Sequence, residues 1–147
     1  MAYKKRILIV EDNSESRELL ALILRRSGYD IVEAATGLDA IDQTRATRPD
    51  LIIMDLGLPQ ITGDEATARL KADPSTRDIP VIVNTAFHRE SSLVKCAIAA
   101  GAAEILYKPT PLKVFEEIAL RYLSPNHMLD SPDTNSLRFP DRMVVST

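Results

Sequence analysis

The feature that most constrains the fold is a short apolar run followed at once by a single carboxylate. Residues 51–54 read Leu-Ile-Ile-Met, which is too short for a helix, and Asp55 follows them before a loop that contains proline and glycine. Such runs are typical of strands that are covered on both faces. Because loops at the carboxyl ends of parallel strands hold the functional groups of open α/β sheets, Asp55 is expected at a crevice rather than in the core.

Three other apolar runs have the same pattern, and each meets a residue that can take part in chemistry. These residues are Glu11 and Asp12 after residues 6–10, Thr85 at the end of residues 81–85, and Lys108 after residues 105–107. If the runs are neighbouring parallel strands, their carboxyl ends lie at one edge of the sheet. Three carboxylates, one hydroxyl and one ammonium are then expected to share a pocket.

Helical patterns separate these runs along the chain. Asn13 or Ser14 is expected to cap the first helix, Thr36 to cap the second, and Gly28 to end the first. Five strands that alternate with five helices through short turns predict an α/β fold with a parallel sheet and right-handed crossovers.

The order and spacing of the polar residues resemble those of the receiver domain of bacterial two-component response regulators. The residues that carry the resemblance are the pair Glu11-Asp12, then Asp55, then Thr85, then Lys108-Pro109. The resemblance covers roughly residues 5–123, and five positions in the right order are more specific than any one motif. It implies a flavodoxin-like, doubly wound (βα)5 fold with strand order 2-1-3-4-5, in which the three carboxylates converge.

Length and composition divide the chain into one domain and a tail. A chain of 147 residues with 45% hydrophobic residues is long enough for one domain with its own core. We predict a receiver domain over residues 1–123 and a tail without domain structure over residues 124–147, where proline, aspartate and serine occur without helical periodicity. Phe139 and Met143 leave open whether the tail packs on the domain or extends from it.

The charge and the cysteine content argue against several classes of protein. A formal net charge of -3 argues against sequence-independent binding of nucleic acid, which needs a basic surface. Cys96 is the only cysteine, so no disulfide can form within the chain, and this suits a reducing compartment. The apolar run before Glu11 is too short for a signal peptide or a membrane span. A cytoplasmic protein without a membrane partner is therefore expected.

The acidic residues predict a site for a hard divalent cation. Glu11, Asp12 and Asp55 would repel one another if packed together, and would raise the pKa of a carboxyl group, unless a cation neutralises them. Magnesium prefers oxygen ligands and keeps several waters. The resemblance implies that Asp12 and Asp55 bind Mg2+ directly, that Glu11 acts through water, and that the backbone carbonyl of Gly57 is a further ligand. The alternative is that Glu11 and Asp12 only cap the first helix.

The resemblance also implies roles for the other residues of the pocket. Asp55 is then the phosphoryl acceptor, Lys108 stabilises the transferring group, and Thr85 hydrogen-bonds a phosphoryl oxygen. A cis peptide bond between Lys108 and Pro109 is also expected. Without the resemblance, Asp55 reads as a turn residue, Thr85 as the end of a strand and Lys108 as an ordinary surface lysine.

The function that the resemblance implies is that of a stand-alone response regulator. Asp55 is expected to accept a phosphoryl group from a sensor histidine kinase or a histidine phosphotransfer protein in a Mg2+-dependent reaction. The protein then signals by contact with a partner protein, without binding nucleic acid directly, and is a phosphoryl acceptor rather than an enzyme. A homodimer is expected through the face of the fourth helix, fifth strand and fifth helix, or through the first and fifth helices. The alternative is a pseudo-receiver, a protein-interaction module that signals without phosphorylation.

Two other functions of related folds are disfavoured. A flavodoxin needs a backbone that cradles a phosphate after the first strand, where Glu11 and Asp12 would repel that phosphate. An aspartyl-phosphate hydrolase of the haloacid dehalogenase type needs a second aspartate two residues after its nucleophile, where this chain has Gly57.

Two features distinguish this chain among receivers. Most receivers have an aromatic residue three positions before the lysine, but this chain has Ile105 there, and Tyr107 lies beside Lys108 on the same strand face as Ile105. The usual coupling of the threonine to that aromatic residue is therefore not expected in its ordinary form. In the family, the positions of Gly57 and Phe87 border the path of water to the phosphoryl group. Neither residue can position a water, so a long-lived phosphoaspartate is expected.

Overall fold

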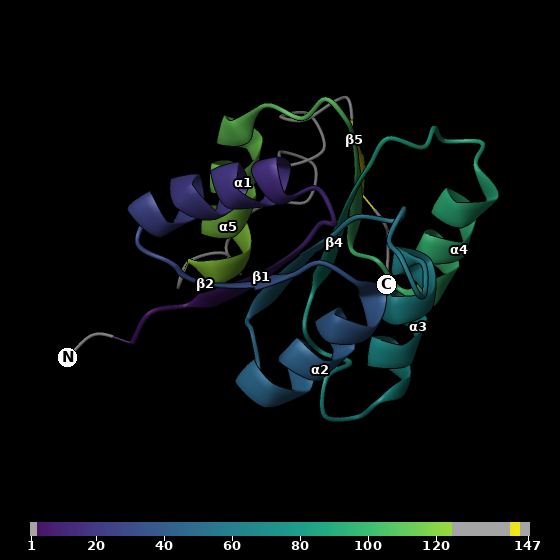
Figure 1. Cartoon of the computed structure of the whole chain (residues 1–147), viewed down its shortest axis with the longest axis horizontal. Helices are drawn as coiled ribbons and strands as arrows, with labels where there is room; N and C mark the ends of the chain where they lie inside the picture. The colour runs from purple at the N-terminus through teal and green to yellow at the C-terminus, as the bar shows by residue number, and fades with distance from the viewer. Residues whose placement is uncertain (1–2, 125–141, 145–147) are drawn as a thin grey trace.

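The structure, a computed structural model, describes residues 3–124 and 142–144. The strands are β1 (Arg6–Val10), β2 (Asp30–Ala34), β3 (Leu51–Met54), β4 (Val81–Thr85), β5 (Glu104–Tyr107) and β6 (Arg142–Val144). The helices are α1 (Ser14–Arg26), α2 (Gly37–Thr47), α3 (Gly63–Ala72), α4 (Ser92–Ala100) and α5 (Leu112–Leu123). One sheet separates two layers of helices, with α1 and α5 on one face and α2, α3 and α4 on the other (Figure 1).

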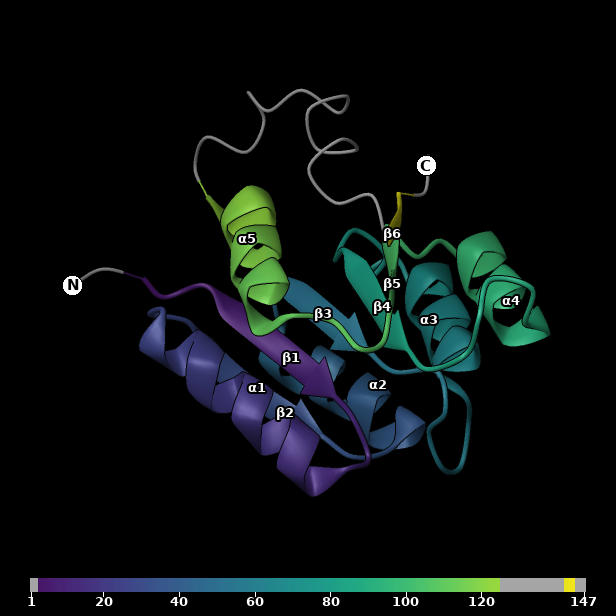
Figure 2. The ribbon, with the colours of Figure 1, turned by 90° about the horizontal axis from the view of Figure 1, so that it is seen from above.

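The strand order of the sheet is β2-β1-β3-β4-β5-β6. The first five strands are parallel, which confirms the predicted flavodoxin-like order 2-1-3-4-5. The short strand β6, at the end of the chain, pairs antiparallel with β5 and was not predicted (Figure 2). Met143 lies in β6 opposite Ile105, whereas Phe139 lies outside the described residues. A tail without domain structure therefore stays a prediction for most of residues 124–147.

The central parts of β1, β3 and β4 are apolar because each face of the sheet is covered by helices. Ile53 packs with the core beneath α1 and α5, and the next residue, Met54, packs with the core beneath α2, α3 and α4. This alternation follows from the two-residue period of a strand. Among the described residues, no helix combines the length and the apolar composition that crossing a membrane requires.

The helices begin at the side chains that the sequence indicates. The Asn13 side chain accepts a hydrogen bond from the Ser16 N–H, and the Thr36 side chain accepts one from the Asp39 N–H, which confirms both predicted caps. Gly28 follows α1 with a φ of 99°, a left-handed conformation that glycine adopts without steric cost. Asn13 and Thr36 thus fix where a helix starts after a strand, and Gly28 fixes where α1 ends before β2.

A buried ion pair joins β5 to α5. The Arg121 guanidinium donates to the fully buried Glu104 carboxylate at 2.9 Å, and the Tyr122 hydroxyl donates to the same carboxylate. Charged groups are rarely this buried unless they are paired. Sequence reasoning did not find this pair, because Glu104 opens a strand and reads as a surface residue.

Candidate functional site

The sheet order brings the acidic residues together at one edge. Val10 lies opposite Met54 in the pairing of β1 with β3, and the Asp55 N–H donates to the Val10 carbonyl at 3.0 Å. The residues that follow each strand are therefore neighbours. One ligand oxygen from each of Glu11, Asp12 and Asp55 lies within 4.8 Å of the other two. The predicted convergence of these carboxylates is present in the structure.

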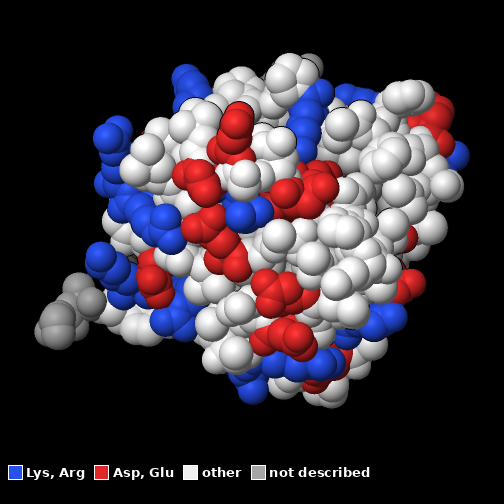
Figure 3. Space-filling model, viewed as in Figure 1, with Lys and Arg blue, Asp and Glu red and all other residues white. Residues whose placement is uncertain are grey.

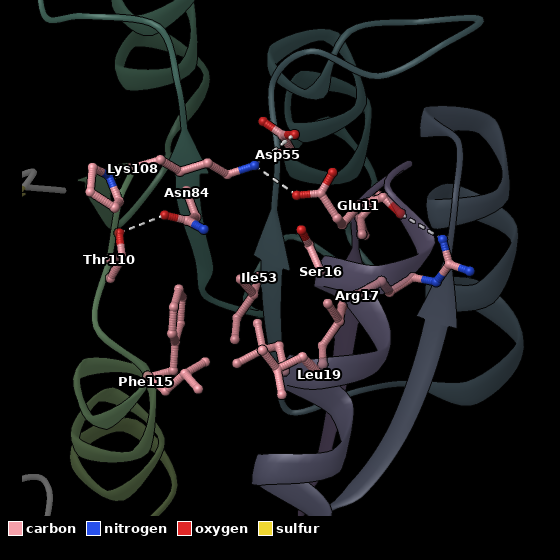
Figure 4. A pocket seen from close by; sticks show the side chains of 15 residues that line it. Glu11, Ser16, Arg17, Leu19, Ile53, Asp55, Asn84, Lys108, Thr110 and Phe115 are labelled. Carbon is pink, nitrogen blue, oxygen red and sulfur yellow. Dashed lines mark hydrogen bonds and ion pairs between the residues drawn. The ribbon is translucent and has the colours of Figure 1, made fainter.

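Lys108 reaches this acidic group from the end of β5. Its ammonium nitrogen lies 2.7 Å from Oε1 of Glu11 and 3.3 Å from Oδ2 of Asp55 (Figure 4). Burial alone lowers the pKa of Lys108, but the hydrogen bond to Glu11 and the charges of Asp55 and Glu11 outweigh it, so the pKa lies above its ordinary value. The peptide bond between Lys108 and Pro109 is cis, as predicted.

The two oxygens of Asp55 have different partners. Oδ1 accepts hydrogen bonds from the backbone N–H groups of Leu56 at 2.7 Å and Gly57 at 3.4 Å, whereas Oδ2 faces Lys108. The side chain of Asp55 is 12% exposed. Asp55 is thus fixed by its own loop while one oxygen is directed toward the cation. This arrangement argues against a simple turn residue.

Glu11 combines a local contact with a contact in the site. Its Oε2 accepts from the Asn13 N–H at 3.1 Å, which resembles the helix-capping alternative, but its Oε1 accepts from Lys108. Asp12 is exposed next to it. Because all three acidic residues offer carboxylate oxygens at close range, the donor set fits a hard divalent cation such as Mg2+.

Thr85 and Phe87 lie on the other side of Asp55. Thr85 is fully buried, and its hydroxyl accepts a hydrogen bond from the Phe87 N–H at 3.1 Å. The Phe87 side chain is 40% exposed, yet its ring would lie 3.5 Å from a Cβ atom built on Gly57. Phe87 therefore lies beside the Asp55 loop. Ile105 and Tyr107 both pack on the face of α2, α3 and α4, as predicted from strand alternation.

A hollow of about 550 Å3 opens beside the site, between α1 and the connection from β5 to α5. It is lined by Glu11, Asp55 and Lys108 of the site and by residues from four neighbouring segments (Figure 4). These are Ser16 and Leu19 from α1, Asn84 from β4, Thr110 from the loop after β5, and Phe115 from α5. The Thr110 hydroxyl donates to Asn84 Oδ1 at 2.8 Å. Sequence reasoning did not single out Asn84 or Thr110. The available signal was that Asn84, a polar residue, directly follows the apolar residues 81–83.

Gly63, the first residue of α3, allows the Asp55 loop to close. A Cβ atom at Gly63 would lie 2.0 Å from the Asp55 carbonyl oxygen, which is backbone and cannot turn aside. Gly63→Ala is therefore expected to lower the free energy of unfolding by at least about 2 kcal/mol. Gly57→Ala, in the same loop, is the matched control, because its Cβ would make only ordinary contact with Phe87. Urea unfolding of both variants checks this, and equal stability would contradict it.

Comparisons with known proteins agree with this geometry. Residues 7–119 match the family model described as the response regulator receiver domain. The polar-differentiation response regulator DivK of Brucella anthropi is 38% identical over 119 residues, which cover 81% of this chain and 96% of that protein. A putative response regulator from Chloroflexus aurantiacus superposes with a TM-score of 0.75 at 31% identity, covering 83% of this chain and 99% of that one.

A further solved structure bears on the metal site. The receiver domain of a sensor histidine kinase from Pseudomonas aeruginosa, which has a magnesium ion coordinated in its active site cleft, superposes with a TM-score of 0.74 at 30% identity. The alignment covers 82% of this chain and 98% of that one. The family match spans most of the chain, and the relatives are matched over nearly their whole length. The chain therefore belongs to the family of response regulator receiver domains.

Proposed function

We propose that the protein is a response regulator in which Asp55 accepts a phosphoryl group from a phosphohistidine on a sensor histidine kinase or a histidine phosphotransfer protein. The reaction requires Mg2+, and the phosphorylated protein signals by contact with a partner protein. The observation that carries this proposal is the position of the Lys108 ammonium, which hydrogen-bonds both Glu11 and Asp55 where three carboxylates converge. Membership of a family that serves phosphorelay signalling supports it.

The chemistry follows from the two oxygens of Asp55. Oδ2 attacks the phosphorus, the bond between phosphorus and the donor's imidazole nitrogen breaks, and that nitrogen leaves with the electron pair. An acyl phosphate forms on Asp55. Oδ1 stays held by the backbone N–H groups of Leu56 and Gly57, so the carboxylate is oriented for attack. Lys108 offsets the negative charge of the transferring group from its place beside Oδ2.

In this proposal Asp12, Asp55 and the backbone carbonyl of Gly57 bind the metal directly, and Glu11 contacts it through water. When bound, magnesium would offset the negative charge of the phosphoryl oxygens and of the neighbouring carboxylates. Thr85 is proposed to hydrogen-bond a phosphoryl oxygen. In the described part of the chain its hydroxyl accepts one hydrogen bond, and no acceptor takes its proton.

Intact-mass measurement with acetyl phosphate and Mg2+ tests the function. We expect the mass of one phosphoryl group on the wild type, none on Asp55→Asn, and none when EDTA removes the metal. Asp42→Asn, an exposed aspartate on α2, is the matched control and should label like the wild type. Label on Asp55→Asn, or full labelling in EDTA, would overturn the proposal. A wild type that stays unlabelled, also with a phosphorylated kinase, would favour the pseudo-receiver alternative.

The hollow beside the site is a suitable surface for the phosphoryl donor. Leu19 lines it and is 49% exposed, so a large apolar side chain lies at the entrance to Asp55. Exposed apolar surface beside a functional site is typical of a surface that contacts another protein. A donor protein that docks here would bring its phosphohistidine to the carboxylate.

Leu19→Glu should therefore slow phosphotransfer from a phosphorylated histidine kinase by about fivefold or more, while labelling by acetyl phosphate stays unchanged. The small donor makes no contact with α1, so the two donors separate docking from chemistry. Leu38→Glu is the control, because Leu38 is 41% exposed on α2, on the opposite face of the sheet. The rates are compared at equal kinase concentration. An equal loss with both donors would mean that Leu19 acts on the site itself.

Other parts of the proposal concern partners and place. We propose a cytoplasmic protein that does not bind nucleic acid directly. Acidic side chains form a band across one face of the molecule, and their negative charge would repel the phosphates of a nucleic acid (Figure 3).

We also propose a homodimer, through the face of α4, β5 and α5 or through α1 and α5. Because β6 already pairs with the edge of β5, a dimer on the first face must contact its helices or displace β6. Light scattering with and without acetyl phosphate tests this.

A further inference from the structure

The side chain that transmits the state of Asp55 to the surface is not the one at the usual position. This inference rests on the proposed phosphorylation of Asp55. Ile105 is fully buried and lies opposite Val83 in the pairing of β4 with β5. It has no polar group and no exposed atom with which to present a change to a partner. Tyr107 lies directly opposite Thr85 in the same pairing and is partly exposed.

Thr85 links the site to the loop that precedes α4, residues 86–91. Its hydroxyl holds the Phe87 N–H at 3.1 Å, and its carbonyl accepts from the Lys108 N–H at 2.8 Å. Among the described residues, nothing accepts the Thr85 hydroxyl proton. A phosphoryl group on Asp55 would bring new acceptor oxygens to this edge of the sheet. The same hydroxyl thus contacts the loop through its oxygen and has an unused proton to donate.

Tyr107 is held under this loop by Arg89. The Arg89 guanidinium carbon lies 4.9 Å from the centre of the Tyr107 ring, within the range of a cation–π contact. The Tyr107 hydroxyl is buried and has no hydrogen-bond partner in the part of the chain that the structure describes. Burial raises the pKa of this hydroxyl, against a lowering effect of the Arg89 charge. A buried hydroxyl without a partner costs free energy, so Tyr107 depends on packing and on Arg89 for this position.

The surroundings leave room for Tyr107 and the loop to move. A hollow of about 470 Å3 lies between them, lined by Phe87, Arg89, Tyr107 and Pro109 among others. It opens at the surface between the loop before α4 and the end of β5. A ring that turns into this hollow can bring its hydroxyl to water, which removes the cost of the missing hydrogen bond.

We propose that Tyr107, held by Arg89, is the residue that reports phosphorylation of Asp55 at the surface of this protein. Phosphorylation draws the Thr85 hydroxyl toward a phosphoryl oxygen, and the Phe87 N–H loses its acceptor. The loop of residues 86–91 then shifts and carries Arg89 away from the ring. Tyr107 turns outward and presents its hydroxyl to the partner protein. The Tyr107 hydroxyl thereby moves from a buried to a solvent-exposed position.

The test follows the tyrosines of the full-length chain by 19F NMR after incorporation of 3-fluorotyrosine. The chain has four tyrosines, so the spectrum is simple, and Tyr107→Phe assigns the signal. With acetyl phosphate and Mg2+, the Tyr107 signal should shift and be broadened more strongly by a soluble gadolinium chelate. Tyr29, directly before β2 at the other edge of the sheet, should not change. Intact mass on the same sample shows whether Asp55 is phosphorylated.

Four variants test each step of this path. Thr85→Ser keeps the hydroxyl and should keep the response, whereas Thr85→Val should remove the difference between the two states. Arg89→Leu should expose Tyr107 to the chelate before phosphorylation, and Arg77→Leu, an exposed arginine outside the loop, should not. A phosphorylated sample in which Tyr107 responds no more than Tyr29 would overturn this inference and leave the proposed function intact. A sample without a phosphoryl group on Asp55 would overturn both.

Discussion

Replacing Lys108 by alanine should slow the phosphorylation of Asp55 by about 100-fold, the effect of removing one preorganised donor from a site of charge transfer. The ammonium lies 3.3 Å from the attacking carboxylate and 2.7 Å from Glu11, so it is already in place before the donor arrives. Its pKa is raised, so the charge and any stability that depends on it are fully present below the ordinary value of 10.5 and are lost as the pH rises through the raised pKa. The rate should therefore show no titration of Lys108 near neutral pH.

The initial rate of labelling by acetyl phosphate, measured by intact mass at saturating Mg2+, gives this result directly. Calorimetry of Mg2+ binding should show that Lys108→Ala still binds the ion, because the carboxylates are unchanged and lose a competing cation. Lys113→Ala, an exposed lysine on α5, is the control for the loss of a positive charge. Wild-type labelling rates in Lys108→Ala would show that the ammonium only pairs with the carboxylates and does not assist the transfer.

The second large effect is on the lifetime of the phosphoaspartate. Gly57 and Phe87 lie beside Asp55, with the Phe87 ring 3.5 Å from the place of a Cβ atom on Gly57. The apolar ring and the missing side chain leave nothing to position a water for in-line attack. Phosphate loss should therefore be slow in the wild type. Gly57→Asn or Phe87→Lys, which add a polar group at this place, should speed it on the order of 10- to 100-fold.

Phosphate release from purified, phosphorylated protein after removal of the donor measures this lifetime. Phe87→Leu keeps an apolar side chain at the same position and should leave the lifetime close to that of the wild type. The position of Phe87 beside Gly57 favours a covered path over the alternative in which the ring points only into solvent. If neither polar substitution accelerates the loss of phosphate, water access is controlled elsewhere.

Most of the fold follows from short-range patterns in the sequence. The apolar runs could only be strands of a sheet covered on both faces, and cap residues such as Asn13 and Thr36 fixed where the helices start. Strand β6 escaped prediction because its three residues have no period of their own and form a strand only against the free edge of β5. The Glu104–Arg121 pair escaped for a similar reason, since burial of a charge depends on packing that sequence does not display.

The acidic part of the site could be predicted because it depends only on which strands are neighbours. Once β1 and β3 are adjacent, Glu11 and Asp55 must meet. The contacts that depend on loop conformation could not be predicted. The Asn84–Thr110 hydrogen bond depends on the loop between β5 and α5, and the place of Phe87 depends on the loops that follow β3 and β4.

The proposed function requires that Asp55 itself carries the phosphoryl group, so we would locate that group in the labelled protein. Borohydride reduces an acyl phosphate to an alcohol, so treatment of the labelled protein should convert Asp55 to homoserine. Peptide mass spectrometry should then find this change at residue 55 in labelled wild type, and at no other aspartate or glutamate. Conversion at Asp12 or Glu11, or a phosphoryl group that resists borohydride and lies on a serine, threonine or histidine, would contradict the account.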